Sequence, residues 1–317
     1  GEIAGVRLLD DSLVATALTF EHTQVHIAQA TLAESGGSRG LGEALARALL
    51  TEELAHVLVF SDGLEVNGSA LVDGLAAVLP AGVGVTGGMA ADGPRFGETV
   101  VVEDGAILRG GAVAIGLVGR RLRAGYGSLG GWDPFGAEWE ITRADGNVLY
   151  ELDRRSAIPL YESYLGDHAR DLPSSGLLFP LALRRADDPR PVVRTLLALD
   201  REAGTMTFAG DMPVGARARF MKANFDRLVD GAEGAARIST ISLGEVPATV
   251  ALLISCVGRK LVLQQRVEEE LDGVRHVLGD SPVLTGFYSY GEIAPWAPGG
   301  ACTLHNQTMT VTTLREE

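Results

Sequence analysis

The sequence predicts an α/β fold with two mixed-sheet halves, each of which combines strands and helices. Apolar segments of strand length alternate with segments of helical spacing along most of the 317 residues. Hydrophobic residues make up 46% of the chain, enough for a sizeable core in each half. A chain of this length holds roughly two domains. A charged stretch rich in proline and glycine covers 167–190, so we expect one domain at 1–155 and another at 156–317.

The first half contains clear helix and strand signals. Leu41, Leu45 and Leu49 recur at helical spacing and predict a helix over 40–50. The apolar strand 56–60 precedes a helix at 69–79, which Pro80 ends. Further strands are expected at 13–20, 23–28, 83–86, 99–102 and 112–118, followed by a glycine-rich loop over 125–136.

The second half begins after a hairpin. Asp145-Gly146-Asn147 separates two strand-like segments, which is a good hairpin signal. Gly166 ends a short helix at 157–165, and a long helix is predicted at 260–278 because its apolar residues fall on one face. The other elements are strands at 177–183, 192–199, 205–208 and 248–255, a strand and a helix within 216–232, and two strands in the last thirty residues.

The two halves contain a similar strand–helix–strand unit. In the first, a strand ends at Ser61-Asp62-Gly63 and the next enters Thr86-Gly87; in the second, a strand ends at Ser255-Cys256 and the next enters Thr285-Gly286. Parallel strands joined by a crossover end at the same edge of a sheet. An internal repeat would therefore gather four strand-end loops around one site between the halves. Such units are common, so coincidence is the alternative.

Charge and composition narrow the class of protein. The net charge of −14 argues against nucleic acid and anionic membranes as partners, since both require basic surfaces. Apolar runs are far shorter than the ~20 residues of a membrane span. Two cysteines form no disulfide framework, so a soluble protein of the reducing cytoplasm is expected. Because Gly1 stands in place of Met, we expect a processed or trimmed N-terminus.

The C-terminal region is unusually rich in functional groups. Residues 286–295 read GFYSYGEIAP, and 302–310 read CTLHNQTMT. These motifs resemble the C-terminal signature of the FIST family of bacterial sensory proteins. The resemblance extends over most of the chain, through SDGLEVNGSAL at 61–71, VTGGMAADGPRF at 85–96, GGWDPFG at 130–136, GNVLYELD at 146–153, FAGDMP at 208–213 and SCVGRK at 255–260.

The resemblance implies an intracellular sensory module of signal transduction. Such proteins are proposed to bind small molecules, for example amino acids, here in a pocket between the two halves. The chain carries FIST N-like and FIST C-like parts without an attached kinase or cyclase. It is therefore expected to pass its signal to a separate signalling protein.

Seven residues are candidates for the ligand site. Cys256 and Arg259 lie between a strand and a helix, where helix N–H groups and a guanidinium suit a ligand carboxylate. On one regular strand, the candidates Tyr290 and Glu292 share a face with Tyr288, which is not counted among the seven, and two rings beside a carboxylate suit an ammonium group. Asp62, His305 and Asn306 complete the set. Each has a structural alternative. Asp62 could cap the next helix, Cys256 could pack as a small apolar residue, and His305 could be structural. Arg259 and Glu292 could be solvated or pair with each other.

Two functions of other classes remain alternatives. Some FIST relatives bind haem and respond to nitric oxide, and His305 or His276 would then be the axial ligand. A thiol enzyme would use Cys256 with His305 as its base. No motif demands an enzyme. The G-x-G-x-x-G match at 82–87 lies within a strand rather than before a helix, and His22 and His26 lie in a strand-like segment without metal-ligating partners.

Overall fold

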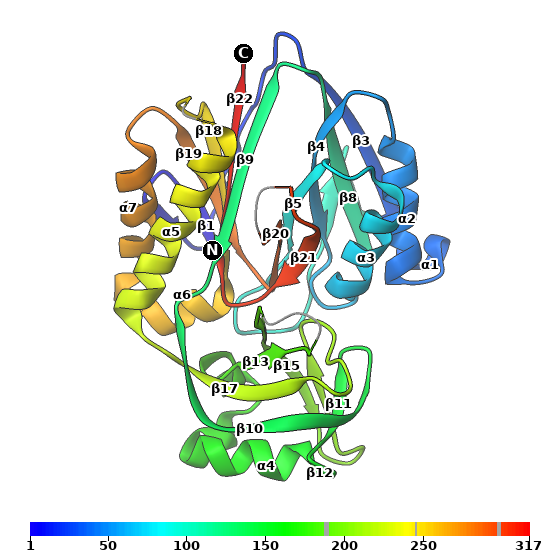
Figure 1. The fold of residues 1–317 in the computed structure, drawn as a ribbon, viewed down its shortest axis with the longest axis vertical. Coiled ribbons are helices and arrows are strands. Elements are labelled where there is room, and N and C mark those ends of the chain that lie inside the picture. Colours follow the sequence, from blue (N-terminus) through cyan, green and yellow to red (C-terminus); the bar gives the residue numbers. More distant parts are fainter. Residues whose placement is uncertain (187–189, 245, 297–298) are drawn as a thin grey trace.

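The computed structural model describes residues 1–186, 190–244, 246–296 and 299–317, and it confirms the α/β class. Two six-stranded sheets stack face to face, and helices cover the outer face of each (Figure 1). A third lobe, residues 132–223, lies at one end of this four-layer body (Figure 1). No helix in the described part of the chain is long and apolar enough to cross a membrane.

The first sheet has the strand order β21-β20-β5-β4-β8-β3. Helices α2 and α3 pack on its outer face through leucines at the predicted helical spacing. Its strands are β3 (Gln24–Thr31), β4 (Leu54–Ser61), β5 (Gly84–Met89), β8 (Gly111–Val118), β20 (Gly291–Pro295) and β21 (Cys302–His305). Its helices are α1 (Leu32–Ser35), α2 (Ser38–Leu49) and α3 (Gly68–Val78). We call these elements the first unit.

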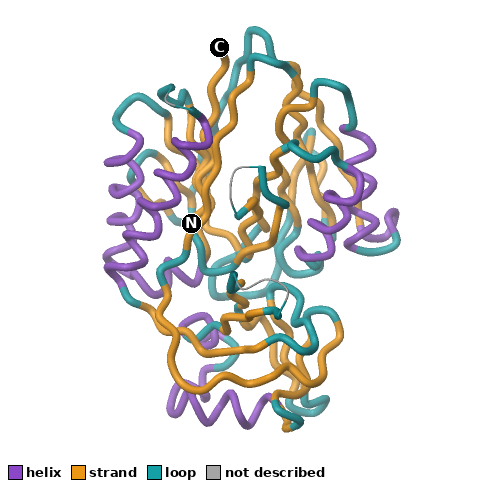
Figure 2. Tube along the Cα trace, in the orientation of Figure 1, coloured by secondary structure: helices purple, strands orange, loops and turns teal. Residues whose placement is uncertain are grey.

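The second sheet has the order β2-β1-β19-β18-β22-β9. Helices α5 and α7 cover its outer face (Figure 2). Its strands are β1 (Glu2–Ala4), β2 (Arg7–Leu9), β9 (Leu122–Leu129), β18 (Val250–Cys256), β19 (Val283–Ser289) and β22 (Met309–Glu316). Its helical segments are α5 (Phe225–Leu243), α6 (Val257–Leu263), the 3-10 turn η3 (Gln264–Arg266) and α7 (Val267–Leu278). We call these elements the second unit.

The third lobe is inserted between β9 and α5. Aromatic side chains of β10, β17 and α4 form its core. Its strands are β10 (Trp132–Asp145), β11 (Val148–Leu152), β12 (Arg155–Ser156), β13 (Leu181–Arg184), β14 (Val192–Arg194), β15 (Leu196–Asp200), β16 (Thr205–Phe208) and β17 (Arg217–Ala223). Its helices are α4 (Ala157–Leu165) and the 3-10 segments η1 (Gly166–Asp171) and η2 (Ser174–Leu178). A separate hairpin of the chain joins β6 (Val101–Glu103) to β7 (Ala106–Leu108).

The predicted strand–helix–strand unit is present in both sheets. In each, the two strands of the unit are parallel and their outer neighbours are antiparallel. Gly87 and Gly286 occupy equivalent places: a Cβ would lie 1.8 Å from the Val59 carbonyl oxygen at Gly87 and 1.7 Å from that of Leu253 at Gly286. Only glycine allows this close approach of neighbouring backbones.

The repeat also includes the edge strands. The sequence Gly-Glu-Ile-Ala occurs at 1–4 and again at 291–294. Ile3 pairs with Gly286 in the second sheet, and Ile293 pairs with Gly87 in the first. Each sheet thus combines strands from both sides of residue 155, because β9 lies in the second sheet and β20–β21 in the first.

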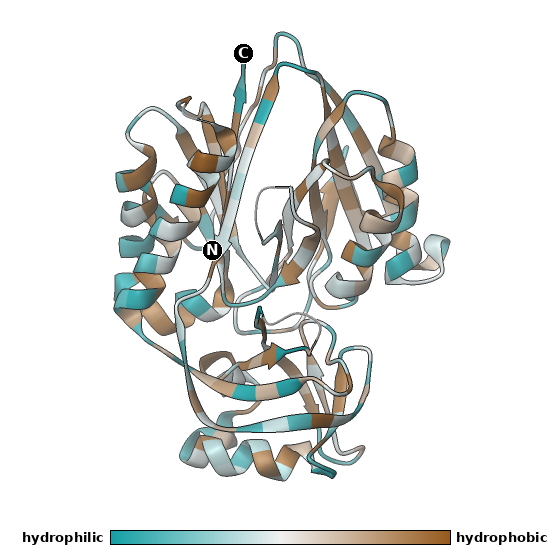
Figure 3. Cartoon of the chain, viewed as in Figure 1, coloured by the Kyte–Doolittle hydropathy of each residue, from teal (hydrophilic) through white to brown (hydrophobic). Residues whose placement is uncertain are grey.

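The layer between the sheets contains many hydroxyl groups. Thr312 donates to Thr86, which is also hydrogen-bonded to His56, each at 2.9 Å. The outer faces follow the more usual pattern, with hydrophobic residues toward the sheets and hydrophilic ones toward solvent (Figure 3). Buried hydroxyls need partners, so these pairs fix how the two sheets face each other.

Several predicted elements differ from the observed ones. Residues 13–20 form no strand, and 99–102 contributes to the β6–β7 hairpin rather than to a large sheet. The loop predicted at 125–136 is largely strand, in β9 and β10. The helix predicted at 260–278 is interrupted at Gln264, whose φ of 49° is not helical. The last thirty residues were predicted to form two strands, but they contain the end of β19 and the three strands β20, β21 and β22. The chain crosses to the first sheet after β19 and returns to the second before β22.

Candidate functional site

Glu292 lies at the junction of the two sheets, completely buried. Its carboxylate accepts hydrogen bonds from the Ser289 hydroxyl at 2.5 Å, the Thr308 N–H at 3.1 Å and the Thr308 hydroxyl at 3.0 Å. Burial raises its pKa to about 8, although these donors favour the charged form. Glu292 therefore ties β20 to the ends of β19 and β22.

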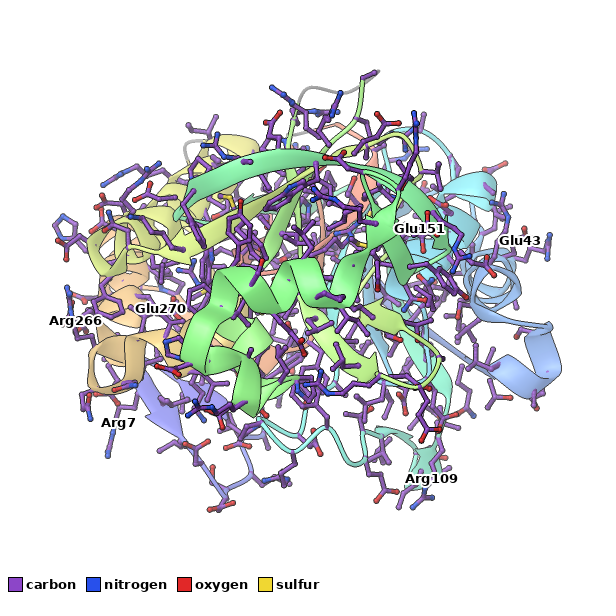
Figure 4. All side chains as sticks on the ribbon, turned by 90° about the horizontal axis from the view of Figure 1, so that it is seen from below. Arg7, Glu43, Arg109, Glu151, Arg266 and Glu270 are labelled. Atoms are coloured by element: carbon purple, nitrogen blue, oxygen red, sulfur yellow. The ribbon has the colours of Figure 1, made fainter. Side chains whose placement is uncertain are left out.

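Arg259 is also completely buried, and it pairs with Glu270 rather than with Glu292. Its Nε and one terminal nitrogen donate to Glu270 at 3.0 and 2.8 Å. The remaining donors reach the carbonyl oxygens of Gly130 and Leu228. Seen from the third lobe, Glu270 lies inward on α7 while Arg266 lies at the surface (Figure 4). The Arg259 guanidinium, which was predicted to hold a ligand carboxylate, thus binds the carboxylate of Glu270 instead.

Tyr288 and Tyr290 do not share a face, contrary to the prediction from strand periodicity. The Tyr288 hydroxyl donates to Glu270 at 2.6 Å within the second unit. The Tyr290 hydroxyl contacts Asp92 and donates to the Gly93 carbonyl oxygen at 2.5 Å. The reason is that β19 ends at Ser289 and the chain crosses to the other sheet at Tyr290.

Cys256 is the N-cap residue of α6 and is 2% exposed. Burial, followed by the nearby charge of Glu292, raises the pKa of its thiol. His305, its predicted base, hydrogen-bonds the Ala294 carbonyl oxygen and packs edge-on against Trp296. Burial lowers the pKa of His305 to about 4, so its ring is neutral at pH 7.

The other candidates also serve internal contacts. Asp62 accepts from the Leu64 and Glu65 N–H groups and from Thr99, so it organises the loop that follows β4. Asn306 donates to the Tyr290 carbonyl oxygen at 3.0 Å. His276, the second haem candidate, lies on the exposed side of α7.

The structure therefore brings the seven predicted residues only partly together. Cys256, Arg259 and Glu292 are electrostatic neighbours, and Asn306 contacts Tyr290. His305 is the register partner of Glu292, but its ring nitrogen is directed to the Ala294 carbonyl oxygen. None of the seven lines any of the four best-formed cavities among the described residues.

A cavity of about 510 Å³ lies between the first unit and the third lobe. We call it the lobe cavity. Helix α3, strand β21 and the residues after β20 form one wall, and β13, β14 and the segment after β16 form the other. Its lining residues are Ser69, Val72, Asp73, Leu183, Arg185, Arg190, Val192, Arg194, Asp211, Pro213, Trp296, Cys302, Thr303 and Leu304.

Arg194 is the buried cation of the lobe cavity, with 5% of its surface exposed. It donates to the carbonyl oxygens of Val193, Leu304 and Asp211 at 3.1 to 3.2 Å, and more weakly to the Ser69 hydroxyl at 3.5 Å. These acceptors are all neutral. The nearby Asp211 carboxylate partly offsets the effect of burial on the pKa of Arg194, but it forms no direct salt bridge with Arg194 among the described residues. Burial lowers its pKa to about 10, so it stays charged at pH 7.

The cavity also has an acidic side. Burial and the nearby charge of Asp211 raise the pKa of Asp73. One oxygen of Asp211 accepts from the Asn67 side chain at 2.9 Å. Trp296 contributes an aromatic wall, with the Arg190 guanidinium 6.0 Å from its ring centre. Charges of both signs thus lie around one cavity with an aromatic surface.

Comparison with known proteins identifies the family. The family model of the FIST N domain matches residues 1–155, and that of the FIST C domain matches 157–295. The chain belongs to the FIST family. FIST N and FIST C domains are sensory domains of signal transduction, so the protein has a sensory domain architecture.

Similar proteins occur in mycobacteria. An uncharacterized protein of Mycobacterium bovis and one of Mycobacterium tuberculosis are each 28% identical over 242 residues, which is 73% of this chain and 60% of each relative. Another uncharacterized protein of M. tuberculosis is 28% identical over 269 residues, or 80% of this chain and 66% of the relative. The chain thus spans about 60 to 66% of the length of these curated relatives.

The predicted site residues mostly build the joint between the sheets. The lobe cavity includes Ser69, Asp211 and Leu304 from the FIST-like motifs, but none of its lining residues was predicted as a site residue. One signal was available for Arg194. It interrupts the apolar run Val192-Val193-Arg194-Thr195-Leu196, which predicts a buried charge. No group of three or more potential metal-ligating side chains occurs among the residues that the structure describes.

Proposed function

We propose that this FIST protein is a sensor that binds a small molecule carrying a carboxylate and an amino group, such as an amino acid, in the lobe cavity. The observation that carries the proposal is the Arg194 guanidinium. A buried cation is costly unless a negative charge compensates it. Arg194 lines a cavity, and its hydrogen-bond acceptors among the described residues are neutral. The Asp211 carboxylate is a nearby counter-charge without a direct contact, so a ligand carboxylate would be the direct ionic partner of Arg194.

The acidic side of the cavity suits the amino group. Burial and, after it, the nearby charge of Asp211 raise the pKa of Asp73, so the two carboxylates destabilise each other's charged forms. An ammonium group near them would stabilise both charged forms. The face of Trp296 would bind the ligand's side chain or its cationic group.

The position of the cavity supports a sensory role. Its walls belong to two bodies, the first unit and the third lobe. A ligand that contacts both would favour one arrangement of the lobe over others, which is how ligands shift conformational populations. We propose that a separate signalling protein in the cytoplasm reads the position of the lobe.

A thermal-shift screen tests this function. The full chain is heated with single amino acids, the corresponding amines, related carboxylates and haem. Binding to the native state alone raises stability by about 2.7 kcal/mol when the ligand is present at a hundredfold excess over Kd. A shift with an amino-bearing acid, reduced in Asp73→Asn but kept in the surface control Asp272→Asn, supports the proposal.

Three other results of the screen would count against the proposed ligand or the proposed site. A shift with haem alone would favour the haem-binding alternative and direct attention to the histidines. A shift that is identical in wild type and Asp73→Asn would place the ligand outside the lobe cavity. No shift with any compound would contradict small-molecule binding of this class.

A further inference from the structure

Phe96 has an unusual backbone and an unusual neighbour. Its φ is +48°, a left-handed conformation that a bulky side chain rarely adopts. Its ring stacks on Tyr290 with centres 4.9 Å apart and planes 10° apart. Strained residues of this kind persist where the surroundings hold them, and they are concentrated at ligand sites.

Hydrogen bonds hold the loop of Phe96 at both ends. Asp92 accepts from the Gly97 N–H at 2.8 Å and from the Glu98 N–H at 3.2 Å, and it contacts the Tyr290 hydroxyl. On the other side, Thr99 donates to Asp62 at 2.9 Å. The loop is thus fixed around Phe96, and the ring keeps a defined position.

Tyr290 is fixed as well. A Cβ on Gly63 would lie 3.0 Å from the Tyr290 ring, so the ring lies directly on the Gly63 backbone. The Tyr290 hydroxyl donates to the Gly93 carbonyl oxygen, and Asn306 holds the Tyr290 carbonyl oxygen. Phe96 is therefore the outer ring of a fixed aromatic pair.

Phe96 and Gly63 line a second cavity of about 350 Å³, which we call the Phe96 cavity. It lies where β4 and β5 end, opposite β15 and β16 of the third lobe. Most of its lining residues are apolar, but polar atoms form about half of its exposed surface, and amide and hydroxyl groups lie at Asn67, Asn147 and Thr207. Glu65 is the charged residue of the lining, and its side chain is exposed.

We propose that the Phe96 cavity binds an uncharged planar ring compound against the Phe96 ring. Aromatic rings attract one another in offset or edge-to-face contacts beyond the area they bury. Small-molecule pockets combine hydrophobic and aromatic side chains with a few polar groups, and this cavity contains both kinds. This site is separate from the lobe cavity and does not depend on the proposed amino-acid ligand.

The neutral fluorescent probe N-phenyl-1-naphthylamine tests the site with the full chain. Two variants remove it in different ways. Phe96→Gly deletes the ring and relieves the positive φ, so the loop keeps its favoured backbone. Ala198→Trp fills the cavity from the third lobe. Phe225→Ala is the matched control, because Phe225 is an exposed aromatic residue on α5.

We expect wild type to show saturable probe fluorescence with a single affinity. Both cavity variants should bind the probe at least tenfold more weakly, and Phe225→Ala should bind as wild type does. Circular dichroism establishes that each variant is folded. The absence of saturable binding to wild type, or wild-type affinity in either cavity variant, would overturn the proposal.

Discussion

The side-chain amide of Asn67 donates a 2.9 Å hydrogen bond to the carboxylate of Asp211 and so joins the first unit to the third lobe. Asn67 is also the N-cap of α3, since its side-chain oxygen accepts from the Ala70 N–H at 3.1 Å. Asp211 lines the lobe cavity, and Asn67 lines the Phe96 cavity. This contact therefore lies between the two cavities, and a displacement of the third lobe would move a wall of each.

The variant Asn67→Asp tests this joint. It keeps an acceptor at the N-cap but places a carboxylate against Asp211. We expect a loss of about 1–2 kcal/mol in the free energy of unfolding at pH 7, from repulsion and the lost hydrogen bond. The loss should shrink near pH 4, where one carboxyl group is protonated and can donate. Urea unfolding at both pH values measures it, and an equal loss at the two would contradict the account.

Glu292 predicts a dependence of stability on pH. Its pKa is about 8 in the fold against an ordinary value of 4.5, so the native state binds the extra proton between these values. The Glu292 contribution is therefore fully present below pH 4.5 and is lost as pH rises through about 8. A shift of this size corresponds to a few kcal/mol.

Glu292→Gln isolates that contribution, because the amide resembles the protonated acid and does not titrate. We expect the wild type to lose more stability than Glu292→Gln between pH 5 and pH 9. Urea unfolding across this range gives the difference. Parallel profiles for the two proteins would show that Glu292 is ionised in the fold at an ordinary pKa.

Arg259 and Glu270 form a fully buried ion pair, and each single substitution leaves the other charge without a partner. Arg259→Met and Glu270→Gln should each cost about 3–5 kcal/mol. The double variant should cost less than the sum of the two, because it removes both charges. A double-mutant cycle by urea unfolding checks this. Additive losses would mean that the two groups do not interact.

His56 predicts a loss of stability in acid. Burial lowers its pKa to about 4, so between pH 6.5 and 4 the unfolded chain binds the additional proton. Stability from His56 is complete above pH 6.5 and falls as pH approaches 4. His56→Phe keeps a ring to stack on Tyr126, which lies 5.9 Å away, and removes the titration. It should lose less stability than wild type between pH 7 and pH 4.5; an equal loss would contradict this assignment.

Sequence reasoning predicted the local elements better than the arrangement of strands. Amphipathic spacing identified α2 and α3, and the Thr86-Gly87 and Thr285-Gly286 motifs revealed a repeat that extends to both sheets. The sequence could not show that β20 lies in a different sheet from β19. Periodicity indicates which residues of a strand share a face, but it does not indicate the strand with which they pair. The predicted shared face of Tyr288 and Tyr290 was wrong for this reason.

The site was harder to predict than the fold. Arg259 and Glu292 have the chemistry of ligand-binding residues, but internal partners such as Glu270 and Thr308 use their hydrogen-bonding groups. Those partners are distant in sequence or lie on another element, so no local pattern reveals them. Arg194 is recognised as a candidate only from the structure, in which it lines a cavity beside α3.

The most direct test of the central claim is titration calorimetry with an amino acid found by the screen and with its carboxamide, which lacks the carboxylate charge. If Arg194 binds that carboxylate, wild type should bind the acid about tenfold to a hundredfold more tightly than the carboxamide. In Arg194→Met, the preference should largely disappear, with Arg194→Lys retaining part of it. Equal affinity of wild type for the two compounds, or an unchanged preference in Arg194→Met, would contradict the proposed site.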